Sequence, residues 1–331
     1  MPVNQTGLNT ILQSGKATVT FADPVEEDEV VRPTEQIADA QIAFCSCLPI
    51  NLDAMPRLEF VQIASSGYSQ LLPHRLPERG IRASNARGVF DTAIAEWNVA
   101  MMVNLARHFR QMIRNQDGGV WDRSACFQTE IRGATVGLWG YGGIARQTAR
   151  LCKSLGLRVH ALTRSGRTVR DNAYCVENSG DVAGTLPDRV FGMAEKFEFL
   201  RDLDFLILCT PHTAQTEGMV GPEELDALPQ RAYLLNPARG LLVQESPLIE
   251  ALRSQSIAGA AIDTHYQYPL PPEHPLWNMK NVILTPHISG SSQSPYFLNR
   301  IWDLFAQNVA RFCAGEPLLN ELSSRELLNL Q

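Results

Sequence analysis

This 331-residue chain lacks any apolar run that approaches the roughly 18 residues of a membrane span. Its first residues, MPVNQTGLNTILQSGK, show no basic region followed by an apolar one, so we expect no secretory leader. An excess of positive charge is also absent, because 29 Lys and Arg against 35 Asp and Glu give a net charge of −6. We therefore expect neither nucleic acid nor an anionic membrane as a partner.

Closely spaced cysteines are scarce as well. Of the seven cysteines, only Cys45 and Cys47 lie near each other in the sequence. Two small apolar residues on a strand explain that pair better than a metal or redox motif. The scattered, odd number of cysteines predicts reduced thiols, a cytoplasmic protein and no metal site.

The first hundred residues predict a small α/β unit. Short apolar runs at 41–47, 59–65 and 80–85 are separated by breaks and are typical of strands. In the segment 88–112 apolar residues recur at intervals of three or four, which predicts one long amphipathic helix.

From about residue 133 the pattern changes to a second, larger α/β domain. Ser246 and Pro247 predict an N-cap and first turn for one of its helices. A last amphipathic helix at 296–313 is expected to return the chain to the first domain, and the irregular stretch 165–195 is expected to be a surface insertion. Nearly continuous apolar runs, which suit strands buried on both faces of a parallel sheet, lie at 135–140, 158–163, 204–210, 232–236, 258–263 and 281–285.

A glycine-rich turn joins the first of these strands to a helix in TVGLWGYGGIARQTA. Gly140 allows a tight turn, Gly142 lets the backbone approach a pyrophosphate, and Ala145 is small enough for close packing of helix and strand. The free amides at the helix N-terminus then face the phosphates. Flanked by a strand and a helix, this spacing predicts a dinucleotide site.

The acidic residue that usually follows such a turn by about 20 positions is missing. Thr163 stands there, and Arg164 and Arg167 follow it. Arginine can bind the 2′-phosphate that an acid would repel, so the sequence predicts a preference for NADP(H), with NAD(H) possible. The alternative is that both arginines are ordinary solvated charges of a loop.

Three polar segments follow later strands, at the sheet edge where ligands bind in such folds. They are CTPHTAQT (209–216), NPARG (236–240) and TPHISG (285–290), with Asp263 between the last two. Taken singly, Arg239 could cap a helix, His287 could be a core histidine and Asp263 could be an N-cap. Together they favour an active site.

The order and spacing of these pieces resemble the D-isomer-specific 2-hydroxyacid dehydrogenase family. The resemblance runs from about 40 to 315 and is most specific across 133–290, in segments such as GYGGIA, NPARG and NVILTPHISG. NADP-preferring glyoxylate/hydroxypyruvate reductases are the most similar members, on the Thr163–Arg164 pair and the PLPPEHPLW loop. The resemblance implies a Rossmann-type doubly wound parallel sheet, residues 102–291, inserted into a smaller flavodoxin-like α/β substrate domain, residues 1–101 plus 292–331.

The resemblance also implies roles for single residues. Arg239 is similar to the arginine that binds the substrate carboxylate and the 2-oxo oxygen, His287 to the proton donor, and Asp263 to an aspartate near the nicotinamide. A homodimer built through the dinucleotide-binding domain is implied, with 117–133 as the arm. Further implied contacts are Ser66 and Gly67 with the substrate carboxylate, Gly143 and Ile144 with the pyrophosphate, and Thr210, Pro211, Thr216, Pro237 and Ala238 with the rest of the cofactor.

The implied reaction is the reduction of a 2-oxo acid to a D-2-hydroxy acid. Hydride transfer to the carbonyl carbon builds negative charge on the oxygen, which a guanidinium stabilises and an imidazole protonates. A cleft between two domains would exclude water during the transfer.

One position departs from the family pattern. A glutamate paired with the catalytic histidine is expected five positions after Asp263, and Tyr268 stands there. Three interpretations are open. Tyr268 orients His287 by a hydrogen bond; Glu273 takes over the pairing; or the protein has lost dehydrogenase activity and is an NADP(H)-binding sensor or interaction protein.

Overall fold

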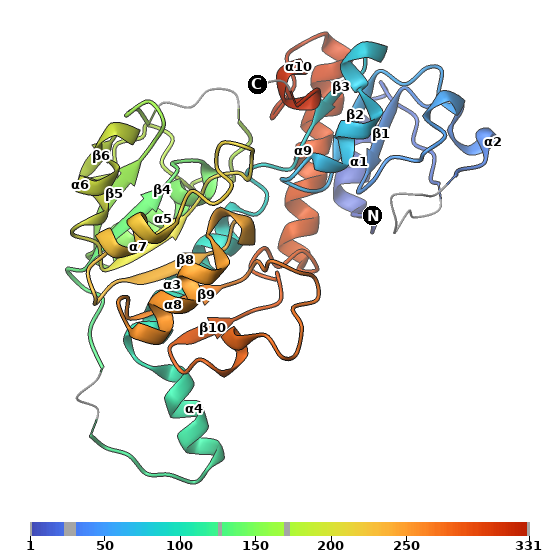
Figure 1. Cartoon of the computed structure of the whole chain (residues 1–331). Coiled ribbons are helices and arrows are strands. Elements are labelled where there is room, and N and C mark those ends of the chain that lie inside the picture. Colours follow the sequence, from blue (N-terminus) through green and yellow to red (C-terminus); the bar gives the residue numbers. More distant parts are fainter. Residues whose placement is uncertain (1, 23–30, 125–127, 169–172, 330–331) are drawn as a thin grey trace. The chain divides into compact units, whose positions relative to one another are not determined.

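The computed structural model describes residues 2–22, 31–124, 128–168 and 173–329. The chain forms two compact units (Figure 1). The expected boundary after residue 101 falls inside helix α3 (Asp91–Ala106), which belongs wholly to unit 2, and the insertion contributes to both units. Unit 1 comprises Met1–Phe90, Asp171–Val176 and Ser292–Gln331, and unit 2 comprises Asp91–Arg170 and Glu177–Ser291.

Unit 2 contains a parallel sheet, whose seven strands in the described residues are ordered β10-β9-β8-β7-β4-β5-β6. Strands β4, β5 and β6 extend the sheet to one side, and β7 to β10 extend it to the other side. The boundary between β4 and β7 is therefore the topological switch point, where such sheets bind ligands. This confirms the predicted Rossmann-type fold. The strands are β4 Thr135–Trp139, β5 Arg158–Leu162, β6 Arg189–Phe191, β7 Phe205–Leu208, β8 Tyr233–Asn236, β9 Gly259–Ile262 and β10 Val282–Leu284.

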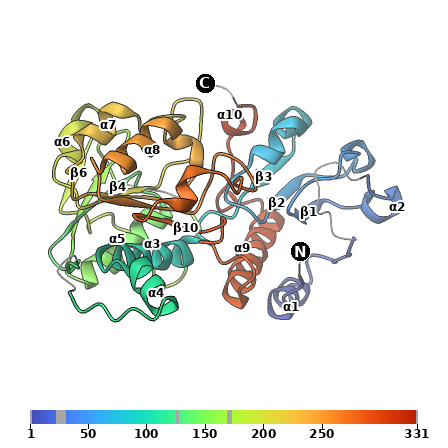
Figure 2. The same ribbon diagram turned by 60° about the horizontal axis from the view of Figure 1, so that its bottom comes forward.

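Helices cover both faces of this sheet. Helices α6 (Lys196–Leu200), α7 (Pro222–Ala227) and α8 (Glu245–Ser254) lie on one face, and α3 and α5 (Gly143–Ser154) lie on the other (Figure 2). Successive residues of β7 point into opposite cores, so that strand had to be apolar throughout. The short strand β6 was not predicted, because it lies within the irregular stretch and two of its three residues are exposed.

The predicted helix 88–112 is two helices. Helix α3 ends at Ala106, and α4 (Phe109–Asp117) begins after His108, whose left-handed φ of 50° cannot continue an α-helix. The apolar periodicity runs across the break, although no residue of α4 is buried. Helix α8 also differs from its prediction, since it begins at Glu245 with Gln244 rather than Ser246 as its N-cap.

Unit 1 has a smaller parallel sheet. Its strands in the described residues are ordered β1-β2-β3, fewer than the five of a flavodoxin-like sheet. Helices α1 (Gln5–Gln13) and α9 (Pro295–Ala314) pack together, and α9 buries Asn308, which donates to Gln62 Oε1 at 2.9 Å. The other elements are β1 Ile42–Cys45, β2 Phe60–Ile63, β3 Arg82–Ser84, α2 Thr34–Ile37 and α10 Ser324–Leu327.

The described cysteines are all free thiols. Burial raises the pKa of the Cys45 thiol to about 12, as expected of an unreactive cysteine on a strand. None of the helices in the described part of the chain is long and apolar enough to cross a bilayer.

Candidate active site

The glycine turn after β4 has the geometry that a dinucleotide requires. Gly140 has a φ of 95°, and a Cβ atom there would lie 2.8 Å from the carbonyl oxygen of Cys209, so only glycine fits. Gly142 is the N-cap of α5, and a Cβ atom there would meet nothing within 4 Å. The space above Gly142 is therefore open beside the first amides of α5, contributed by Gly143 and Ile144, where a pyrophosphate can approach.

Three polar side chains in the loop after β5 have no hydrogen-bond or ion-pair partner among the described residues. The hydroxyl oxygen of Thr163 is buried and has no hydrogen-bond partner within the described residues. Arg164 and Arg167 are exposed, and neither forms a hydrogen bond or an ion pair with any described residue. An unpaired hydroxyl and two free cations suit the ribose end of a phosphorylated dinucleotide.

A third arginine close to this turn was missed by the sequence analysis. Arg146, on the first turn of α5, is only 5% exposed. Its guanidinium donates to the carbonyl oxygens of Asp181 and Thr168 and lies 5.1 Å from the centre of the Tyr141 ring. Its hydrogen bonds are thus made to the insertion.

Asp181 joins the insertion to Tyr141, in the glycine turn before α5. Its carboxylate accepts hydrogen bonds from Tyr141 Oη at 2.7 Å and from the backbone N–H groups of Thr185 and Leu186, each at 3.0 Å. Burial alone would raise the pKa of this carboxyl group, but these hydrogen bonds and the charge of Arg146 lower it. No local sequence pattern links Tyr141 to an acid 40 positions away.

The loop after β7 contains three of the predicted cofactor residues. Thr216 Oγ1 donates to the carbonyl oxygen of Pro211 at 2.7 Å and accepts from the N–H of Thr213 at 2.8 Å. Thr210 contacts the sulfur of Met219 at 3.7 Å. In this structure the Thr216 side chain therefore shapes the loop through its own backbone.

Arg239 lies on a short loop that Asn236, the last residue of β8, holds together. Asn236 accepts from the N–H of Ala238 at 3.1 Å and donates to the carbonyl oxygen of Arg239 at 2.8 Å, with Pro237 enclosed between them. The exposed Arg239 guanidinium donates to the carbonyl oxygen of Ala238 at 2.6 Å and has no other hydrogen bond or ion pair with a described residue. It remains available to an anion.

The Asp263 carboxylate is fully buried and holds the turn that contains His287. It accepts from Thr285 Oγ1 at 2.5 Å, from the N–H groups of Ile288 at 2.9 Å and Ser289 at 3.0 Å, and from Ser289 Oγ at 2.5 Å. His287, with a left-handed φ of 57°, donates its N–H to the Asp263 carbonyl oxygen at 2.7 Å. The buried carboxylate thus fixes a strained turn.

His287 and Arg239 come close enough to interact electrostatically. Partial burial, and next the positive charge of Arg239, lower the pKa of His287 below its ordinary value, and the charge of Asp263 only partly opposes this. The charge of Arg239, in the loop after β8, thus acts on the imidazole of His287, in the turn after β10.

Tyr268 does not orient His287 by a hydrogen bond. Its ring lies 5.5 Å from the His287 ring at an angle of 49°, while its hydroxyl oxygen accepts from the N–H of His265 at 3.2 Å. Glu273 is exposed and has no ion pair within the described residues. His274, which follows Glu273, lies 2.6 Å from the carboxylate of Glu245 on α8. Neither of these two alternative contacts is formed, and the Tyr268 ring packs near the His287 ring instead.

Ser66 and Gly67 lie in unit 1, in the loop after β2. Ser66 Oγ donates to the carbonyl oxygen of Ala86 at 3.3 Å, and the carbonyl oxygen of Gly67 accepts from Ser65 Oγ at 2.8 Å. These side-chain hydrogen bonds fix the backbone of the loop. A site that binds an anion through backbone amides needs its backbone held in this way.

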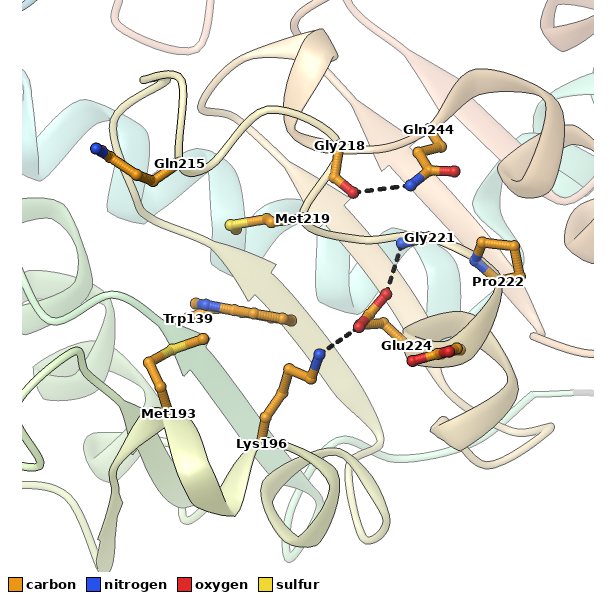
Figure 3. Close-up of a pocket in the computed structure, with 11 residues that line it drawn as sticks. Trp139, Met193, Lys196, Gln215, Gly218, Met219, Gly221, Pro222, Glu224 and Gln244 are labelled. Atoms are coloured by element: carbon orange, nitrogen blue, oxygen red, sulfur yellow. Dashed lines mark hydrogen bonds and ion pairs between the residues drawn. The ribbon is translucent and has the colours of Figure 1, made fainter.

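A cavity of about 630 Å³ in unit 2 contains none of the predicted site residues (Figure 3). Lys196 and Glu224 form an ion pair at 2.5 Å across it, and Glu224 also accepts from the N–H of Gly221 at 2.8 Å. Gln244 donates to the carbonyl oxygen of Gly218 at 3.0 Å. These polar groups satisfy one another and stabilise the chain around α7.

Comparison with known proteins agrees with this geometry. The family model described as "D-isomer specific 2-hydroxyacid dehydrogenase, NAD binding domain" matches residues 99–289. A glyoxylate reductase of Thermofilum pendens is 30% identical over 284 residues, covering 85% of this chain and 79% of that protein. A hydroxypyruvate reductase of Blautia hydrogenotrophica is 26% identical over 292 residues, covering 86% and 85%.

Among solved structures, the NADPH-dependent glyoxylate/hydroxypyruvate reductase of Sinorhizobium meliloti in complex with NADP and malonate is 28% identical. It superimposes with a TM-score of 0.67 and covers 87% of this chain and 86% of its own. The chain therefore belongs to the D-isomer-specific 2-hydroxyacid dehydrogenase family, with its NAD-binding domain in residues 99–289.

Proposed function

We propose that this protein is an NADP-preferring reductase that converts a 2-oxo acid of the glyoxylate/hydroxypyruvate type to a D-2-hydroxy acid. The observation that supports this most directly is the electrostatic effect of Arg239 on His287, since the two residues follow β8 and β10, the strands on either side of β9 in the dinucleotide-binding domain. Neither side chain is needed merely to hold a dinucleotide. The names of the similar reductases support the substrate class.

In this proposal a bound nicotinamide supplies the hydride. Arg239 holds the substrate carboxylate and stabilises the charge that develops on the 2-oxo oxygen, and His287 gives that oxygen a proton. Asp263 keeps the turn of His287 in place next to the nicotinamide, and the amides of Ser66 and Gly67 bind the substrate carboxylate.

The cofactor preference rests on the loop after β5. Arg164 and Arg167 have no partner in the described part of the chain and can bind a 2′-phosphate, and Thr163 introduces no charge that would repel it. A relative crystallised with NADP supports the same preference. Gly140, Gly142, Gly143 and Ile144 would hold the pyrophosphate, and Thr210, Pro211, Thr216, Pro237 and Ala238 would line the rest of the site.

A second candidate function is a catalytically impaired NADP(H)-binding protein. The specific observation in its favour is that His287 has an aromatic neighbour, Tyr268, in place of an acidic partner. The two candidates differ in what happens to NADPH when a 2-oxo acid is added.

The test is a panel of 2-oxo acids with NADPH, followed by loss of NADPH absorbance between about pH 5 and 8. We expect turnover, with Arg239→Gln and His287→Gln each lowering kcat/KM by roughly 10²–10⁴-fold. Arg253→Gln, an exposed arginine on α8, is the matched control and should keep full activity. NADPH binding without turnover of any acid would favour the second candidate.

We also propose a cytoplasmic homodimer that forms through unit 2. The free thiols of the described cysteines fit a reducing compartment. Several apolar side chains near one another in the sequence are exposed, and a second copy of the chain would cover them. They are Phe109 (45% exposed), Ile113 (54%), Val120 (58%) and Trp121 (88%).

A further inference from the structure

His265, two residues after Asp263, has no role in the reaction proposed above, yet it is only 7% exposed. Its Nε2 atom lies 2.9 Å from the carbonyl oxygen of Thr285. A carbonyl oxygen can only accept, so Nε2 must donate and therefore carries the ring proton. Nδ1 is buried without a hydrogen-bond partner in the described residues. A buried polar atom left unpaired is unfavourable, so this imidazole is not explained by packing alone.

The hydrogen bond from His265 acts on the turn of His287. Thr285 lies two residues before His287, and its hydroxyl donates to the Asp263 carboxylate. Its carbonyl oxygen accepts two hydrogen bonds, one from His265 Nε2 and one from the N–H of His287 at 3.0 Å. Because His287 has a φ of 57°, which is disfavoured for a residue with a side chain, the turn needs such contacts to persist.

A second connection runs through Tyr268. The N–H of His265 donates to Tyr268 Oη at 3.2 Å, and the centres of the two rings are 6.2 Å apart. The Tyr268 ring also packs near the His287 ring, with the ring centres 5.5 Å apart. His265 thus supports both the backbone beneath His287 and the ring packed against its imidazole.

The loop that contains Arg239 also contacts His265. A Cβ atom on Gly240 would lie 2.5 Å from the carbonyl carbon and oxygen of His265, so these two segments of backbone are in direct contact. A shift of the His265 backbone would therefore displace the loop of Arg239 as well. The charged and titratable groups around His287 are Arg239, Asp263, His265 and Tyr268.

We propose that His265 is a positioning residue for His287, and that with Tyr268 it takes over the orienting role for which the family pattern has an acid at position 268. This inference rests on the proposed function for its kinetic consequence but not for its geometry. The hydrogen bond to the Thr285 carbonyl oxygen is the interaction on which the role depends.

The kinetic test compares His265→Phe with His265→Gln. Phenylalanine keeps an aromatic ring but cannot donate, whereas the glutamine amide can donate to Thr285 from nearly the position of Nε2. We expect His265→Phe to lower kcat by roughly 10- to 100-fold, with KM for NADPH changed less than about two-fold. We expect His265→Gln to keep kcat within about three-fold of the parent. Equal loss of kcat in both variants, or none in His265→Phe, would overturn the proposal.

A measurement without substrate separates this proposal from the proposed function. In protein labelled with ¹⁵N-histidine, the ring nitrogen shifts of His265 should show a protonated Nε2 and an unprotonated Nδ1. The His287 ring signals should shift in His265→Phe and return toward the parent in His265→Gln. If the parent turns over no 2-oxo acid, the proposed function fails while these spectra still decide the role of His265. A His265 ring protonated at Nδ1 and not at Nε2 would overturn its proposed role as a positioning residue.

Discussion

In the proposed reaction, the protonation state of His287 would favour one direction over the other. Partial burial and the charge of Arg239 lower the pKa of His287, so its neutral form is favoured near neutral pH. Reduction of a 2-oxo acid needs the protonated form, and oxidation of the product needs the neutral form. We therefore expect reduction to be faster on the acid side of neutrality.

Tyr268→Glu tests this account. A carboxylate next to His287 stabilises the imidazolium, so the pH above which the rate of reduction falls should rise by about one unit or more. The control is Tyr268→Gln, because glutamine has nearly the same size as glutamate but no charge. It should produce no such rise in the pH at which the rate falls. A pH–rate profile of Tyr268→Glu that coincides with that of the parent contradicts the prediction.

At the scale of elements, one buried carboxylate, that of Asp181, joins the insertion to the glycine turn before α5 through Tyr141. Asp181→Asn removes the charge that Tyr141 Oη and two backbone N–H groups contact. We expect the free energy of unfolding at pH 7 to fall by about 1–3 kcal/mol, measured by urea denaturation. Asp226→Asn, on the exposed side of α7, is the control and should change little.

The same substitution has an expected pH dependence. Because the pKa of Asp181 is lowered in the folded state, its contribution to stability is present above the pKa of the unfolded state and is lost as pH falls through the folded pKa. Parent and Asp181→Asn should therefore approach equal stability in acid. A difference in stability that stays constant as the pH is lowered would contradict this.

The loop after β5 is the element that we expect to select the cofactor. The double variant Arg164→Gln, Arg167→Gln should lose about ten-fold or more in affinity for NADPH, since a charge-assisted hydrogen bond contributes roughly 1.5–3 kcal/mol. Affinity for NADH, which has no 2′-phosphate, should change little. Both constants can be measured by fluorescence titration, with Arg201→Gln, an exposed arginine after α6, as the control. Equal losses for both cofactors would refute the role of this loop.

At the scale of the whole molecule, we expect two copies to associate through the region of α4. Arg110 ties this helix to the body of unit 2, with hydrogen bonds to the carbonyl oxygens of Trp277 at 2.8 Å and Met279 at 2.5 Å. Two apolar side chains of α4, Phe109 and Ile113, nevertheless stay exposed. A helix that is attached by an arginine while its apolar residues face solvent is suited to contact another chain.

Trp121→Ser should weaken this association. Light scattering after gel filtration should give about twice 36.7 kDa for the parent, and a lower, concentration-dependent mass for the variant. Val182→Ser, which changes a residue 79% exposed elsewhere in unit 2, should leave the mass unchanged. A parent that is monomeric at all concentrations would rule out the homodimer.

Local patterns in the sequence predicted much of the fold. Strands such as β7 were found because burial on both faces demands continuous apolar residues, and the turn at Gly140 was found because only glycine tolerates its φ. The break at His108 and the strand β6 were missed. Two of the three residues of β6 are exposed and so lack the continuous apolar pattern of a buried strand, and the apolar periodicity continues across the break at His108.

By itself, the sequence determined the class of fold and the set of polar residues at the strand ends, because both follow from short-range periodicity and spacing. Only the tertiary structure decided what those residues touch. It placed the Asp263 carboxylate in the turn of His287, joined Tyr141 to Asp181, and put the ring of Tyr268 against His287 while its hydroxyl contacts His265. Such partners depend on the direction of a side chain and on backbone brought near from a distant part of the chain, neither of which a linear pattern encodes.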